Sequence, residues 1–388
     1  MRKTYTVQEL IDMGYIEAPI DGNHGSIHPK TSDYISKGVP FLMVNNMVDG
    51  TVDLENCAFI SEKQAESLRK GFAHPGDVLL SHKATIGRTA IVPDKYETVI
   101  LTPQITYYRV KKNINRRYLK YYFDSPKFQS LFANWAGSGS TRAYLGILAQ
   151  HKLPIVLPNI EEQNKIVDIL YGLDKKIEEN KKINKNLYKQ MLFIFNNAKK
   201  TSSWKHHKLG DVLTFYDNLR KPLSSIQREK MAHIYPYYGA TSIVDYVEDY
   251  LFDGTYILIS EDGANVVDAL GHPLTQYTYG KFWVNNHAHV ARGSSGYSEA
   301  LIYAMLGTLN MQSIVTGAAQ PKINQANLRN FETVLPENEE AQVLSVILTP
   351  MLQQMLYYDQ ENERLSTLRD TLLPQLMSGE LDISAIDL

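Results

Sequence analysis

Two long stretches of the chain carry mostly apolar residues at alternating intervals of four and three positions. In the first stretch these positions are Ile166, Leu170, Leu173, Ile177, Asn180, Asn184, Leu187, Met191 and Ile194. In the second stretch they are Leu344, Leu348, Met351, Met355, Tyr358, Asn362, Leu365, Arg369 and Leu372. Alternating spacing of this kind is typical of helices that pair as a coiled coil. The pattern therefore predicts two long paired helices, over residues 159–200 and 337–388.

The two stretches belong to a repeat, because adding 178 to a position in the first gives the matching position in the second. Leu157-Pro158 corresponds in this way to Leu335-Pro336, and each pair is followed by glutamates that suit the positive end of a helix. Asn184 corresponds to Asn362. Asparagines on such a seam lower stability but favour one register. The internal symmetry predicts that the two helices run antiparallel.

The segments that precede the two helices are rich in predicted strands. Residues 75–81 and 253–260 each show a glycine turn followed by a buried strand, and residues 99–104 resemble residues 282–287. The predicted fold class is α+β. We expect two strand-rich domains, residues 1–158 and 201–336, separated by a pair of long antiparallel coiled-coil helices in an internal two-fold pseudo-repeat.

Composition indicates a globular protein, with 44% hydrophobic and 21% charged residues. No apolar run approaches the roughly 20 residues that a membrane helix needs. The first residues have no apolar core followed by a cleavage site, as a secretory signal would. The single cysteine, Cys57, excludes an internal disulfide. We therefore expect a cytoplasmic protein that does not enter a membrane.

Charge is unevenly distributed along the chain. Residues 1–158 carry a net charge of +5 and residues 159–200 of +3, whereas residues 201–336 carry −2 and residues 337–388 carry −8. The two predicted helices thus have opposite charges, which favours their pairing. The basic excess of the first domain is compatible with binding to nucleic acid.

The motifs of common enzyme classes are missing from the sequence. There is no phosphate-binding P-loop, and the glycine-rich run that begins at Gly137 lacks the third glycine of a dinucleotide fingerprint. His287 and His289 offer two ligands to a metal, which is too few. We therefore predict no cofactor, no metal and no catalytic residue. Glu261 and Asp262 follow a predicted strand, so an enzyme acting on nucleic acid or sugar remains an alternative.

Several predicted loops are rich in side chains that can contact phosphates or base edges. The candidates in the first domain are Asn45, Asn46, Lys83, Thr85, Arg88, Ser138, Ser140, Thr141 and Arg142. Those in the second domain are Tyr238, Thr241, Ser260, Glu261, Asn265, His287, His289, Gln320 and Lys322. Their similar placement in both repeats supports recognition more than any single loop does. A protein-binding adaptor is a second alternative.

The whole chain resembles the specificity subunit of type I restriction-modification systems. The similarity is carried by residues 153–158 with Glu161-Glu162-Gln163, by residues 320–324, and by the C-terminal run over residues 372–381. In the first repeat, Ser140-Thr-Arg-Ala-Tyr144 stands where the second has the more typical Gln320-Pro-Lys-Ile-Asn324.

The resemblance implies that DNA recognition and catalysis belong to different subunits. Each globular domain would be a target recognition domain that reads one half of an asymmetric, bipartite site in double-stranded DNA. The helices would set the spacing between the halves and dock two methyltransferase subunits, which motor-nuclease subunits join in the full complex. The chain itself would be non-catalytic, since methylation and cleavage belong to the partners.

Overall fold

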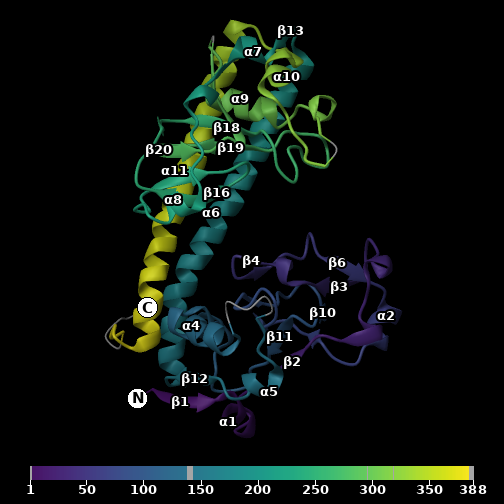
Figure 1. Cartoon of the computed structure of the whole chain (residues 1–388), viewed down its shortest axis with the longest axis vertical. Helices are drawn as coiled ribbons and strands as arrows, with labels where there is room; N and C mark the ends of the chain where they lie inside the picture. The colour runs from purple at the N-terminus through teal and green to yellow at the C-terminus, as the bar shows by residue number, and fades with distance from the viewer. Residues whose placement is uncertain (1, 138–142, 295, 318, 384–388) are drawn as a thin grey trace. The chain divides into compact units, whose positions relative to one another are not determined.

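The computed structural model describes residues 2–137, 143–294, 296–317 and 319–383. The chain divides into two compact units. Unit 1 comprises Met1–Ile177 and Arg364–Leu388, and unit 2 comprises Glu178–Glu363. Each unit contains one strand-rich domain and part of two long helices, α6 (Ile160–Thr201) and α11 (Asn338–Ser378) (Figure 1). Among the described residues, no helix is both long enough and apolar enough to cross a membrane.

Unit 1 contains two four-stranded sheets, with the strand orders β6-β3-β10-β7 and β2-β11-β8-β9. Strands β1 and β12 form a separate pair, as do β4 and β5. The strands are β1 (Lys3–Thr6), β2 (Ile20–Asp21), β3 (Val39–Leu42), β4 (Met47–Val48), β5 (Thr51–Val52), β6 (Ala58–Ile60), β7 (Phe72–Ala73), β8 (Val78–Ser81), β9 (Thr89–Ile91), β10 (Val99–Leu101), β11 (Ile105–Tyr108) and β12 (Pro154–Leu157). The shorter helices are α1 (Val7–Asp12), α2 (Glu62–Ser67), α3 (Arg116–Asp124), α4 (Pro126–Trp135) and α5 (Ile147–Gln150).

Unit 2 repeats the two four-stranded sheets and the separate terminal pair of unit 1, whereas the β4-β5 pair has no equivalent among the described residues of unit 2. Its sheets have the orders β16-β15-β20-β17 and β14-β21-β18-β19, and β13 pairs with β22. The strands are β13 (Lys205–Lys208), β14 (Leu213–Phe215), β15 (Tyr235–Tyr238), β16 (Ile243–Val247), β17 (Phe252–Asp253), β18 (Tyr256–Ser260), β19 (Thr275–Thr278), β20 (Lys281–Val284), β21 (Ala288–Gly293) and β22 (Glu332–Leu335). The shorter helices are α7 (Leu209–Val212), α8 (Ser225–Arg228), α9 (Glu299–Leu306) and α10 (Gln325–Asn330). The predicted α+β fold and its internal repeat are confirmed.

Local sequence signals account for many of the element boundaries. The side chain of Ser125 accepts the backbone N–H of Phe128, and Pro126 occupies the first position of α4. Ser298 caps α9 in the same way. The predicted glycine turns before β8 and β18 are present, since Gly76 and Gly254 have φ angles of 89° and 122°. These angles favour glycine over any residue with a side chain.

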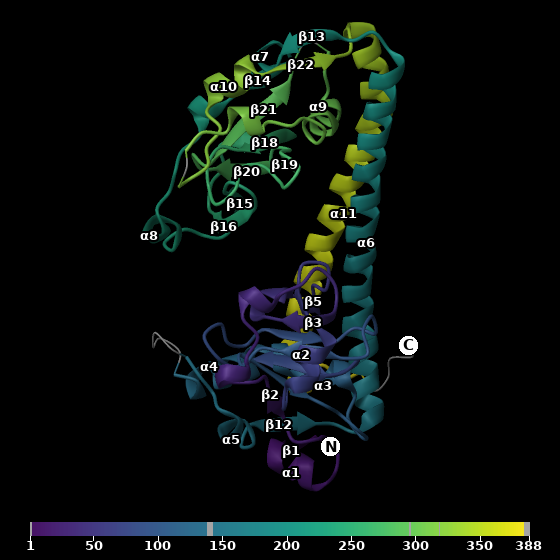
Figure 2. The ribbon, with the colours of Figure 1, turned by 90° about the vertical axis from the view of Figure 1, so that its right-hand side faces the viewer.

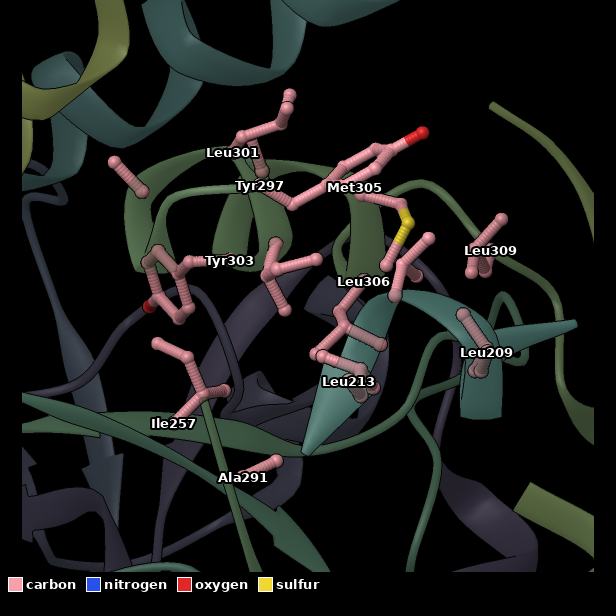
Figure 3. Close-up of a cluster of buried hydrophobic side chains, with 14 of the residues drawn as sticks. Leu209, Leu213, Ile257, Ala291, Tyr297, Leu301, Tyr303, Met305, Leu306 and Leu309 are labelled. Atoms are coloured by element: carbon pink, nitrogen blue, oxygen red, sulfur yellow. The ribbon is translucent and has the colours of Figure 1, made fainter. Parts of the chain in front are cut away.

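In each unit the largest apolar core joins the domain to the long helices. In unit 1, Tyr108 and Phe132 belong to the same buried cluster as Leu170 of α6 and Leu376 of α11. In unit 2, side chains of α9 point toward Ile257 and Ala291 of the neighbouring strands (Figure 3). Each domain is therefore anchored to its part of the helices by buried apolar surface.

The two long helices run antiparallel, as predicted. In unit 1, Arg369 of α11 donates to Asp174 of α6 at 2.8 Å. In unit 2, the side-chain amide of Asn180 donates to the side-chain oxygen of Asn362 at 2.9 Å. Also in unit 2, Ser202, which follows the last residue of α6, donates to Glu340 in the first turn of α11 at 2.5 Å. A late part of α6 thus meets an early part of α11, and Figure 2 shows the two ribbons side by side within this unit.

The seam asparagines do not pair with their own repeat equivalents. Asn184 donates its amide to Asp359 at 2.8 Å and to the carbonyl of Met355 at 3.1 Å, while Asn362 accepts from Asn180. A two-fold axis relates equivalent residues without bringing them into contact, except at the axis itself. Asn184 therefore belongs to a buried polar network that also includes the hydroxyl of Tyr277, which donates to Asp359 at 2.5 Å.

Candidate nucleic-acid interface

Three loops of unit 1 are joined by backbone hydrogen bonds just beyond the end of β8. The N–H of His82 donates to the carbonyl of Gln104 at 2.9 Å, and the N–H of Leu145 donates to the carbonyl of His82 at 3.0 Å. His82 is fully buried, and its Nδ1 lies 3.0 Å from the carbonyl oxygen of Leu145. Burial lowers the pKa of His82, so the neutral ring forms part of this support.

The backbone hydrogen bonds that join these loops in unit 1 form a frame, and unit 2 has the equivalent frame beyond the end of β18. The N–H of Glu261 donates to the carbonyl of His287 at 2.9 Å, and the N–H of Ile323 donates to the carbonyl of Glu261 at 2.8 Å. The loops after β15 and β20 also meet there, because the N–H of Asn285 donates to the carbonyl of Tyr238 at 3.1 Å. The repeat therefore places equivalent loops at the same corner of both domains.

A cavity of about 500 Å³ opens among these loops in unit 1. It is lined by His28, Met43, Val44, Asn45, Lys83, Thr85, Arg88, Thr102, Pro103 and Gln104. Four residues predicted from the sequence, Asn45, Lys83, Thr85 and Arg88, are thus brought together. Gln104 was missed, although residues 99–104 resemble residues 282–287, which end at the predicted His287.

Most of the polar side-chain groups that line the cavity are available to form hydrogen bonds with a ligand. Among the described residues, no side-chain hydrogen bond is found for Asn45, Thr85 or Gln104. The Lys83 ammonium lies 5.9 Å from the ring centre of Tyr144. The guanidinium of Arg88 donates long hydrogen bonds, of 3.3 and 3.4 Å, to the backbone carbonyls of Val44 and Met47. A concave surface with free donors suits the acceptor-rich edges of bases or a phosphate.

One candidate of unit 1 is not on the surface. Asn46 is 3% exposed, and its side chain accepts the N–H of Met43 and donates to the carbonyl of Asn56. Both ends of the amide are thus used inside the fold, and Asn46 supports the turn that carries Asn45 rather than the surface itself. The candidates Ser138, Ser140, Thr141 and Arg142 lie outside the described residues.

An ion-pair network lies beneath the corresponding loops of unit 2. The carboxylate of Glu261 pairs with Arg220 at 2.7 Å and with Lys322 at 3.0 Å. His289 has its Nδ1 2.6 Å from a carboxylate oxygen of Asp217, and its Nε2 lies 2.8 Å from the carbonyl oxygen of Ile323.

Both carboxyl groups of this network remain ionised at neutral pH. Burial acts to raise the pKa of Glu261, but the hydrogen bonds from Arg220 and Lys322 bring it below the ordinary value. Burial likewise acts to raise the pKa of Asp217, but the contacts with His289, the N–H of Val290 and Arg220 together lower it below the ordinary value.

The same network argues against a metal site and against catalysis. Oxygen and nitrogen atoms of Asp217, Glu261 and His289 lie within 4.8 Å of one another, close enough to surround an ion. Arg220 pairs with both carboxylates, Lys322 adds a second cation at Glu261, and both nitrogens of His289 face protein acceptors. The group is therefore a structural ion-pair network, and the alternative of an active site around Glu261 and Asp262 is not supported.

At the surface of unit 2, His287 is held by Asp262. The Nδ1 atom of its ring lies 2.5 Å from a carboxylate oxygen of Asp262, and its backbone N–H donates to the side chain of Asn285. The ring is half exposed, so its Nε2 edge is open to a ligand. The contact with Asp262 therefore orients the imidazole ring through its Nδ1 atom.

The remaining candidates of unit 2 divide by burial. Exposed side chains are those of Thr241, Asn265, Gln320 and Lys322. Tyr238, Ser260 and His289 are 7%, 0% and 1% exposed, respectively. These three side chains are therefore part of the interior: Tyr238 packs in an apolar cluster, Ser260 ends a buried strand and His289 is enclosed in the ion-pair network.

Comparison with known proteins identifies the family. Residues 10–189 and 201–366 each match the family model described as the type I restriction modification DNA specificity domain. The chain belongs to this family. The two matches coincide with the two repeats of the fold, and they confirm the resemblance to a specificity subunit, which in this family is a non-catalytic component.

Individual relatives carry the same description. A type I restriction enzyme specificity subunit of Methanocaldococcus jannaschii is 24% identical over 368 residues, covering 84% of this chain and 82% of that protein. A Haemophilus influenzae protein named as such a subunit is 35% identical over 133 residues, which span only 33% of its length. The crystal structure of the S subunit from M. genitalium has a TM-score of 0.52 at 15% identity, covering 97% of this chain and 96% of that one, and shows the same fold.

Proposed function

We propose that this chain is the DNA-reading subunit of a type I restriction-modification complex. Each strand-rich domain, residues 1–158 and 201–336, reads one half of a bipartite site in double-stranded DNA. The observation that carries the proposal is the matching corner of loops in the two domains of a chain whose two repeats both match the DNA specificity model.

The two half-sites differ in sequence, because the equivalent loops carry different side chains. The unit 1 cavity presents free donors such as Lys83 and Gln104. The unit 2 corner presents carboxylates, of which Asp262 is held by His287 and Glu261 by cations. Donors and acceptors select different base edges, so the target is asymmetric.

The long helices fix the spacing between the half-sites and dock two methyltransferase subunits, and motor-nuclease subunits join the larger complex. Support comes from the antiparallel packing of α6 and α11 in each unit, and from the opposite charges of residues 159–200 and 337–388. The chain as a whole carries a net charge of −2, so partners supply much of the phosphate contact on which DNA affinity depends.

Methylation mapping tests this function. The chain is co-expressed with its methyltransferase, and modified bases are mapped across the host genome. We expect an interrupted motif with two unlike halves, and exchange of residues 201–336 for the same domain of a relative should alter only one half. Absence of any methylated motif, or alteration of both halves by the exchange, contradicts the proposal.

A further inference from the structure

The backbone frame shared by the two domains defines three equivalent surface positions. The residue after His82 in unit 1 is Lys83, and the residue after Glu261 in unit 2 is Asp262. Both face the third loop through isolated β-bridges, Lys83 with Tyr144 and Asp262 with Lys322. Gln104 and His287 share the second position, since each provides the carbonyl that accepts the N–H of the buried frame residue.

We propose that these three positions read the bases, Lys83, Gln104 and Tyr144 in the first domain and Asp262, His287 and Lys322 in the second. This inference rests on the proposed function and names the residues that give each half of the site its sequence. The frame is made by backbone groups, so side chains at the three positions can differ in charge and shape without disturbing it.

The chemistry of the unit 1 positions favours purines. Lys83 is exposed and offers only donors, which match the O6 and N7 acceptors of guanine. Gln104 has an amide with no partner among the described side chains, and it lines the cavity beside Lys83. A free carboxamide can donate to N7 and accept from N6 of adenine. Tyr144 is 48% exposed, and its ring centre lies 5.6 Å from that of His82 and 5.9 Å from the Lys83 ammonium.

At the same positions unit 2 presents the opposite polarity. Asp262 is an acceptor, as required by the N4 amine of cytosine or the N6 amine of adenine. One of its oxygens is engaged by His287, which turns the exposed Nε2 edge of that ring outward. The ammonium of Lys322 lies 3.0 Å from a carboxylate oxygen of Glu261, and this ion pair keeps the donor beside Glu261. We infer that the second half-site contains a base with an exocyclic amine where the first contains a purine acceptor edge.

Selection from a randomised DNA duplex library by the complete complex of this chain with its methyltransferase tests the unit 1 positions. Gln104→Ala and Lys83→Gln should each reduce the preference at one base pair of one half-site by roughly 5- to 150-fold, the value of a good bidentate contact. The other half-site should be selected unchanged, which also shows that the variant is folded. Lys95→Gln is the matched control, because Lys95 is likewise exposed and lies 6.0 Å from the ring centre of Tyr96.

The same selection tests unit 2 with His287→Ala, which should relax one base pair of the other half-site. His272→Ala is its control, since His272 also contacts an aspartate, Asp268, at 3.0 Å but lies away from the frame. If the wild-type complex selects a bipartite site and Gln104→Ala and His287→Ala select the same site unaltered, the inference is wrong while the function stands. If the wild-type complex selects no sequence, the proposed function itself fails.

Discussion

Neutralising Asp217 should destabilise unit 2 more than any exposed aspartate does. The side chain of Asp217 accepts hydrogen bonds from His289 and Gln325 at 2.6 Å each, and from the N–H of Val290 at 2.9 Å. It also pairs with Arg220 at 3.3 Å. These contacts join a turn, strand β21 and helix α10 through one carboxylate that is 9% exposed.

The expected loss in the free energy of unfolding depends on which charged groups remain after the substitution. In Asp217→Asn, the buried His289 and the half-buried Arg220 keep their contacts with Glu261 but lose the second carboxylate, while the new amide hydrogens face other donors. Removal of one partner from a buried charged group costs about 3–5 kcal/mol. Asp268→Asn is the control, because its aspartate also contacts a histidine but is 42% exposed, and such pairs contribute at most about 1 kcal/mol.

Hydrogen exchange of the intact chain provides a local readout. Peptides from β21 should exchange much faster in Asp217→Asn, whereas peptides from the equivalent β11 of unit 1 serve as an internal reference. The lowered pKa of Asp217 means that its stabilisation is complete above the ordinary value of 3.8 and disappears as the pH falls through the lower folded value. Equal exchange of β21 in Asp217→Asn and Asp268→Asn would refute the reasoning.

Three other substitutions test buried polar contacts by thermal or urea unfolding. Burial raises the pKa of Asp359 above its ordinary value of 3.8, so ionisation of this carboxyl group lowers the stability of the folded state as the pH rises above 3.8. Asp359→Asn should therefore have a higher melting temperature than the wild type at neutral pH, and an unchanged or lower melting temperature would contradict this. Asn184→Leu should lose about 1–3 kcal/mol because the half-buried Asp359 loses a donor, and a gain in stability would instead show that the seam prefers an apolar residue. Arg109→Met should cost about 3 kcal/mol, since Arg109 donates two hydrogen bonds to Asp77, whose side chain is 3% exposed, and a change below about 1 kcal/mol would argue against it.

The large features of the fold were predictable because periodicity and repetition report them directly. The alternation from Ile166 to Ile194 marks the buried seam of α6, and the offset of 178 residues relates it to α11. The turns at Gly76 and Gly254 were predictable because their backbone conformations favour glycine. Such signals are local, or they repeat along the chain.

Which polar residues face outward could not be predicted with the same success. Asn45 and Asn46 are neighbours of the same type, yet one is exposed and lines the cavity while the other is buried and supports a turn. His287 and His289 differ similarly, because the first lies in a turn and the second in β21 against Asp217. Composition identifies donor-rich loops, but the direction of each side chain depends on contacts with residues distant in the sequence.

The backbone frame and the surface side chains are separate parts of each domain, which explains how the same fold can present two different recognition surfaces. The frame depends on main-chain N–H and carbonyl groups and on buried residues such as His82, so substitutions there leave polar groups without partners. Substitutions of exposed side chains away from such features usually change stability by no more than about 0.5 kcal/mol. A lysine in one domain and an aspartate in the other can occupy the same position, at Lys83 and Asp262, because the frame at that position is made by backbone groups. Under the proposed function, the sequence that is read changes with these side chains while the architecture that presents them is retained.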